Sequence, residues 1–207
     1  MIAIFLADGF EEIEAIATID FLRRCDLDVQ IIGIEVKDKR KAENLLKAID
    51  RTVAQKFGVV YGAHDIGVIC DFWAPKLLNE LPWEKYDCVI LPGGMPGTKN
   101  LEDSGLVQNA IEYAYQNHRL IAAICAAPSI LAHFRLLEGK KATCFPGFND
   151  DLRDGGAVYT GDYVTEDGNI ITGKGAGCTI DFAEAIAARF VGKDKAREVR
   201  EAMQTPY

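Results

Sequence analysis

The chain has 207 residues, of which 49% are hydrophobic, which is enough for one domain with a full core. Its 31 acidic and 23 basic residues give a net charge of -8, so we expect no nucleic-acid partner. The apolar start at residues 1–7 is interrupted by Asp8, well short of a signal peptide or a membrane span. We therefore expect a cytoplasmic protein with no membrane contact.

Apolar runs typical of buried strands alternate with helical patterns along most of the chain. This alternation predicts a single α/β domain over residues 1–207, with a mostly parallel sheet and helices on both faces. The turn at 166–169 predicts an antiparallel hairpin within 160–174. The expected strands lie near 2–7, 28–35, 86–91 and 120–124, and the expected helices lie near 10–24, 104–117, 127–135, 179–191 and 193–203.

A basic segment stands apart from the rest of this acidic chain. Residues 37–56 contain seven basic and three acidic residues, and apolar residues recur in the segment at helical spacing. We expect a helical insertion at 37–57 that docks by its apolar face and keeps its lysines in solvent. A basic arm that covers a site or meets an acidic partner is the alternative. The apolar positions are Leu45, Leu46, Ile49, Val53 and Phe57.

Cys125 directly follows the buried-strand pattern of residues 120–124, and Pro128 comes three residues later. An apolar strand that runs into a cysteine, with proline in the first helical turn, predicts a sharp strand-to-helix turn. Such a turn aims backbone N–H groups and the positive end of a helix dipole at the sulfur. We therefore expect a reactive thiol whose pKa lies below the ~8.5 of a free cysteine. An ordinary core cysteine is the alternative.

The other five cysteines show no CxxC pair or other short metal-ligand spacing. We expect reduced thiols, no metal site and no cofactor. Cys70, Cys88 and Cys144 lie in or beside apolar runs, which favours burial in the core. Cys178 lies at a second predicted strand-to-helix turn, where it is either a packing residue or a second thiol near Cys125. We favour packing.

Two further segments offer groups that a nucleophilic cysteine needs. Gly93 and Gly94 follow the predicted strand at 86–91, and adjacent glycines let backbone N–H groups approach a ligand at the sheet edge. Glu14 lies beside a predicted inward stripe, so we expect it near Cys125, where burial keeps the carboxyl neutral at pH 7. His64 lies in a loop from which it can reach a ligand. The predicted stripe is Ile13, Ile16, Ala17 and Asp20, while Glu11 and Glu12 are expected only to complement the helix dipole.

These motifs resemble those of the DJ-1/ThiJ/PfpI superfamily, in its ThiJ-like bacterial branch. They occur in the same order along nearly the whole chain: Gly9–Glu14, Asp20–Arg24, Gly62–His64, Leu91–Gly94, Ala122–Pro128 and Gly175–Gly177. The resemblance implies a flavodoxin-like three-layer sandwich that forms a homodimer. It also implies roles for six residues: Cys125 as reactive cysteine, Glu14 as the protonated glutamate beside it, the N–H groups of Gly94 and Ala126 as oxyanion donors, and Gly93 and His64 as substrate-binding residues.

The chain departs from the family pattern at three positions. Ala126 stands where peptidase-like members have histidine, which argues against peptidase activity. Phe145 stands where some relatives have a histidine, and Asp20 lacks its usual histidine partner.

The function implied is that of a cysteine-dependent, glutathione-independent glyoxalase or deglycase. Its partner would be a small carbonyl compound, a 2-oxoaldehyde or its adduct, attacked by Cys125 with Glu14 as acid and base. The alternative is a non-enzymatic oxidative-stress sensor or chaperone-like protein in which Cys125 is oxidised reversibly.

Overall fold

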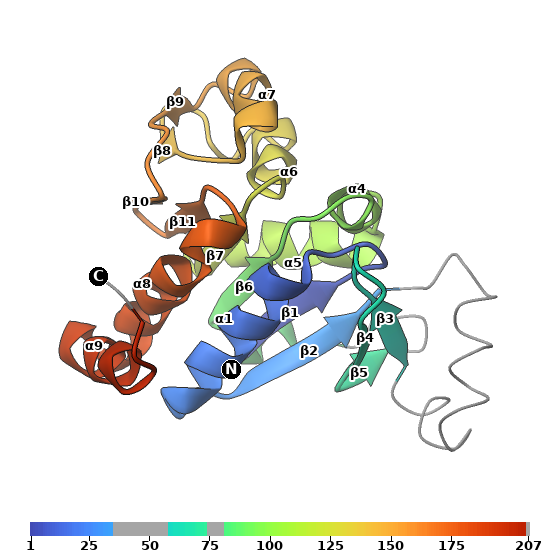
Figure 1. Cartoon of the computed structure of the whole chain (residues 1–207). Coiled ribbons are helices and arrows are strands. Elements are labelled where there is room, and N and C mark those ends of the chain that lie inside the picture. Colours follow the sequence, from blue (N-terminus) through green and yellow to red (C-terminus); the bar gives the residue numbers. More distant parts are fainter. Residues whose placement is uncertain (35–57, 74–80, 206–207) are drawn as a thin grey trace.

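A seven-stranded sheet forms the centre of the molecule, which is described by a computed structural model over residues 1–34, 58–73 and 81–205 (Figure 1). The strand order is β10-β11-β7-β6-β1-β2-β5. Neighbouring strands are parallel except for the β10–β11 pair. The strands are β1 (Ile2–Leu6), β2 (Val29–Gly33), β5 (Phe72–Trp73), β6 (Cys88–Leu91), β7 (Leu120–Ile124), β10 (Val164–Asp167) and β11 (Ile170–Gly173). The predicted insertion at 37–57 lies outside the described residues.

Helices cover both faces of this sheet. Helices α1, α8 and α9 contribute to one hydrophobic core, and α4 to α7 contribute to the other. Figure 1 shows α1 beside α8, which in turn packs against α9. The helices are α1 (Glu12–Arg24), α4 (Gly97–Glu102), α5 (Gly105–Gln116), α6 (Pro128–His133), α7 (Asn149–Asp154), α8 (Thr179–Val191) and α9 (Lys193–Ala202).

Strand β1 shows why the central strands read as continuous apolar runs. Ile2 and Ile4 face the core under α1 and α8, whereas Ala3 and Phe5 face the core under α5. Both faces are covered, so side chains of either parity are buried. This is the predicted three-layer α/β sandwich, and the predicted hairpin at 160–174 is confirmed by the antiparallel β10–β11 pair.

A small hairpin is attached to the start of α1. It consists of β3 (Val59–Tyr61) and the antiparallel β4 (Gly67–Ile69). The N–H of Gly9 donates to the carbonyl of Tyr61, and the N–H of Ala63 donates to the carbonyl of Phe10, both at 2.8 Å. The turn of this hairpin is therefore held against the first residues of α1. A separate pair, β8 (Lys141–Ala142) and β9 (Val158–Tyr159), lies near α7.

The predicted inward stripe of α1 is wrong. Ile13, Ile16 and Asp20 are exposed, while Glu14 lies on the buried face. The buried face is continued by Ala15, Thr18, Ile19 and Leu22. The helix sequence contains two overlapping apolar stripes, and packing against α8 and the sheet decides between them. Among the described helices, none is both long enough and apolar enough to cross a membrane.

Candidate active site

Cys125 occupies the turn between β7 and α6, as the sequence predicts. Its φ is +64°, a left-handed conformation that non-glycine residues adopt only where the surroundings impose it. Its N–H donates to the carbonyl of Gly173 at 2.9 Å, and its carbonyl accepts the N–H of Phe145 at 2.8 Å. These two bonds hold the residue from both sides, so the thiol has a fixed position at the carboxyl edge of the sheet.

Cys125 is the one partly exposed cysteine among the six, all of which are free thiols in the described part of the chain. Cys70, Cys88 and Cys144 are buried, as predicted. The sulfur of buried Cys178 lies 3.1 Å from the carbonyl oxygens of both Tyr163 and Gly175. Cys178 therefore ties two loops together, which is a packing role.

Glu14 reaches the site from the first turn of α1. Its side chain is buried, and its Oε2 accepts the N–H of Gly93 at 2.8 Å. A Cβ added to Gly93 would lie 2.6 Å from Cβ of Cys125 and 2.7 Å from Oε2 of Glu14. Only glycine fits between these two side chains, so the loop after β6 brings them together.

Burial raises the pKa of the Glu14 carboxyl to about 7, with a smaller contribution from the negative charge of Glu11. The thiol of Cys125 and the N–H of Gly93 act against this shift because they hydrogen-bond to the charged form. The raised pKa agrees with the expected direction. A carboxyl with a pKa near 7 can both accept and donate a proton at neutral pH.

The expected low pKa of Cys125 is wrong. Burial and the neighbouring Glu14 carboxylate raise the pKa of this thiol to about 12. Hydrogen bonds from the backbone N–H groups of Ala126 and Gly94 lower it, as the turn geometry predicts, but these contributions are smaller. Burial and a neighbouring negative charge raise the thiol pKa by more than the backbone donors at a helix N-terminus lower it. Loss of the thiol proton therefore requires an acceptor, and the Glu14 carboxylate is hydrogen-bonded to this thiol.

Phe145 and Gly175 border the thiol on its open side. A Cβ at Gly175 would lie 4.0 Å from the sulfur of Cys125 and 3.5 Å from Cδ2 of Phe145. The Phe145 ring is half-exposed. The sequence identifies Phe145 only as a departure from relatives, whereas the structure places its backbone and ring beside Cys125 and Gly175.

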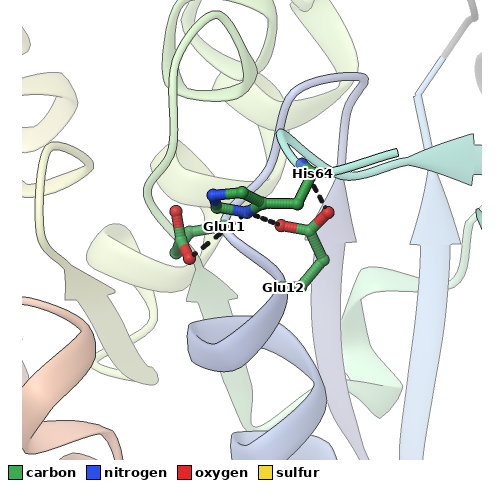
Figure 2. Close-up of side chains that lie close together, drawn as sticks. All are labelled: Glu11, Glu12 and His64. Carbon is green, nitrogen blue, oxygen red and sulfur yellow. Dashed lines mark hydrogen bonds and ion pairs between the residues drawn. The ribbon is translucent and has the colours of Figure 1, made fainter. Parts of the chain in front are cut away.

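His64 has its partners elsewhere. Its Nδ1 lies 2.8 Å from Oε2 of Glu12 and 3.9 Å from Oε1 of Glu11 (Figure 2). These contacts of His64 join the β3–β4 turn to the start of α1, and Cys125 takes no part in them. Glu12, expected only to complement the helix dipole, is buried and fixes this turn. Asp20 pairs on the surface with Arg24, at 2.8 Å.

Comparison with known proteins agrees with this architecture. The DJ-1/PfpI family model matches residues 1–189. The chain is 30% identical to Protein dj-1beta of Drosophila melanogaster over 204 residues, covering 99% of this chain and 96% of that protein. A solved DJ-1 superfamily protein from Salmonella typhimurium superposes with a TM-score of 0.81 at 31% identity, covering 100% of this chain and 98% of that one.

The chain belongs to the DJ-1/PfpI family. One curated relative is the glutathione-independent glyoxalase DJ-1 of Schizosaccharomyces pombe. It is 24% identical over 206 residues, covering 99% of this chain and 98% of that protein.

Proposed function

We propose that this protein is a glutathione-independent glyoxalase-type enzyme that converts small 2-oxoaldehydes to 2-hydroxyacids. The observation that carries the proposal is the contact between Cys125 and Glu14, in which burial raises the pKa of the carboxyl to about 7. The pair supplies a nucleophile and a proton carrier tuned to neutral pH. The activity named for the Schizosaccharomyces pombe relative supports the same reaction class.

The proposed reaction begins with addition of the thiol to the aldehyde. The sulfur of Cys125 bonds to the aldehyde carbon while its proton passes to the Glu14 carboxylate. The aldehyde oxygen becomes an oxyanion, which accepts hydrogen bonds from the N–H groups of Gly94 and Ala126. Proton return from Glu14 to this oxygen gives a hemithioacetal.

The second stage moves a hydrogen between adjacent carbons. Glu14 removes the proton from the former aldehyde carbon, which gives an enediolate, and a proton is then delivered to the neighbouring carbon. One carbon is oxidised and the other is reduced, so no external oxidant is required. The result is a thioester on Cys125, and water cleaves it to release the 2-hydroxyacid and restore the thiol.

The test is lactate formation from methylglyoxal by purified protein without glutathione. The wild-type chain should form lactate, and Cys125→Ala should lose the activity by at least about a hundredfold. Cys25→Ala is the matched control, because it removes another buried thiol, at the opposite end of α1 from Glu14. Lactate formation by Cys125→Ala at the wild-type rate would contradict the proposal. Absence of lactate formation by the wild-type chain would also contradict it and would leave the redox-sensor function of this cysteine.

We also propose that the protein is a homodimer. Ile13 and Ile16 form an exposed apolar stripe on α1, and Ile66 and Ile69 are exposed on the adjoining β3–β4 hairpin. Large apolar side chains gathered on neighbouring elements are typical of interfaces. A second copy of the chain is the occupant that the family relationship favours.

A further inference from the structure

We propose that Glu11, Glu12 and His64 form a binding site for a divalent transition-metal ion, with Zn²⁺ as the representative ion. Each residue offers one ligand atom, and these atoms lie within 4.8 Å of one another. Figure 2 shows the three side chains converging from the start of α1 and from the turn between β3 and β4. The three ligands include neither Cys125 nor Glu14, and the proposal does not depend on the proposed function.

The two carboxylates approach the same imidazole nitrogen. Nδ1 of His64 lies 2.8 Å from Oε2 of Glu12 and 3.9 Å from Oε1 of Glu11. An ion at Nδ1 can therefore reach both carboxylates.

His133, which also has two acidic neighbours, shows the contrast. Glu102 lies at Nδ1 of His133 and Asp151 lies at Nε2. These two nitrogens point in different directions, so the carboxylates of that cluster cannot meet at one ion.

Backbone N–H groups hold the side chain of Glu12 in place. The side chain of Glu12 is only 8% exposed, and its Oε1 accepts the N–H groups of His64 at 2.7 Å and Ile66 at 3.4 Å. A Cβ at Gly62 would lie 2.2 Å from the carboxyl carbon of Glu12, so glycine makes the space for this carboxylate. The hairpin turn is bonded to the start of α1, which fixes the ligand-bearing backbones before an ion arrives.

The donor set selects the class of ion. One imidazole nitrogen with two carboxylate oxygens suits Zn²⁺ and neighbouring divalent transition ions, whereas Ca²⁺ and Mg²⁺ favour oxygen ligands alone and Cu⁺ favours sulfur. Bonds of about 2.1 Å in a tetrahedral site place ligand atoms roughly 3.4 Å apart. The present separations of 2.8 Å and 3.9 Å from Nδ1 of His64 lie on either side of this value.

An ion at Nδ1 takes the place of the hydrogen that this nitrogen shares with Glu12. In the single chain the His64 side chain is 67% exposed, which leaves room for water as a further ligand.

Calorimetric titration of the metal-free full chain with zinc chloride tests the site. A Cys125→Ala background removes the partly exposed thiol as a competing ligand. The background protein should bind one Zn²⁺ per chain, and His64→Ala and Glu11→Gln should each weaken binding at least about tenfold. Circular dichroism should show that both variants remain folded, since His64 is exposed and Glu11 is partly exposed.

His133→Ala is the matched control, because it removes a histidine paired with acids that do not converge. This variant should bind Zn²⁺ as the background protein does. The proposal is overturned if the background protein does not bind, if either ligand variant keeps the full affinity, or if His133→Ala loses as much as His64→Ala. The test uses no Glu12 variant, because Glu12 also holds the β3–β4 turn and its replacement would disturb the backbone there.

Discussion

The backbone N–H of Gly93 donates a 2.8 Å hydrogen bond to Oε2 of Glu14, and this bond joins the loop after β6 to helix α1 beside Cys125. The same glycine leaves no room for a Cβ between the two side chains. The distance between nucleophile and proton carrier is therefore set by a residue that has no side chain. A change at Gly93 should act on both groups at once.

Gly93→Ala should disrupt the site. The added methyl group would lie 2.6 Å from Cβ of Cys125, so either the loop after β6 or the turn at Cys125 has to shift. We expect a loss of roughly 1–3 kcal/mol in the free energy of unfolding, as for other overpacked sites, together with loss of methylglyoxal turnover. Urea denaturation and the lactate assay measure the two effects.

Gly105→Ala is the control for this substitution, because no atom lies within 4 Å of its added Cβ. It should remain within about 1 kcal/mol of the wild-type stability. Equal behaviour of the two alanine variants would show that the close approach at Gly93 is unimportant.

Glu14→Gln should lower the pKa of Cys125. The negative carboxylate is one cause of the raised thiol pKa, and glutamine keeps an acceptor for Gly93 without the charge. We expect the midpoint of iodoacetamide labelling at Cys125 to move down by at least about one pH unit. Peptide mass spectrometry follows the labelling, and Cys125 should be modified before the five buried thiols.

The matched control for this labelling experiment is Glu112→Gln on the exposed face of α5. It removes the same charge far from the site and should leave the midpoint unchanged. An unchanged or higher midpoint in Glu14→Gln would mean that the carboxylate does not act on the thiol.

Glu14 should also make stability depend on pH. Its pKa is about 7 in the folded protein against an ordinary value of 4.5, so between these values the folded state holds a proton that the unfolded chain has lost. The stabilisation is complete below pH 4.5 and is lost as the pH rises through about 7. At about 1.4 kcal/mol per pKa unit, the loss is roughly 3 kcal/mol.

Urea denaturation at pH 5 and pH 8 measures this effect when the wild type is compared with Glu14→Gln. The difference between the two proteins isolates Glu14 from other titrating groups. A wild type and a variant with parallel pH dependence would exclude the raised pKa.

Ile13→Glu should separate the proposed dimer into monomers. The substitution places a charge on the exposed apolar stripe of α1 without touching the buried face that packs against the sheet. Light scattering after size-exclusion chromatography gives the mass. Val158→Glu, at an exposed apolar residue of β9, is the control that should keep the dimer mass. A wild-type chain that is already monomeric would contradict the dimer.

Much of the fold could be predicted from the sequence because its central strands are buried on both faces. An unbroken apolar run followed by small residues and Pro128 predicts both strand β7 and the turn at Cys125. The same kind of pattern does not predict which face of α1 is buried. Ile13 and Ile16 offer an apolar stripe as good as the true one, and the choice depends on α8, far along the chain.

The chemistry of the site was less predictable than its position. The sequence around Cys125 predicts backbone donors that lower the thiol pKa. Burial and the charge of Glu14 raise this pKa by more, and both depend on packing that the local sequence does not show. The pairing of Glu12 with His64 joins residues 52 positions apart, through a turn that a local pattern does not connect to α1.

The pH profile of kcat/KM for methylglyoxal tests the central claim, that Glu14 accepts the proton of the Cys125 thiol. The free enzyme reacts when Glu14 is a carboxylate, so kcat/KM should rise with pH through a single limb near pH 7 and then stay level, because the pKa of Cys125 is about 12. Glu14→Gln should abolish this limb along with most of the activity. A profile that is flat between pH 5.5 and 9, or a limb near pH 7 that survives in Glu14→Gln, would contradict the account.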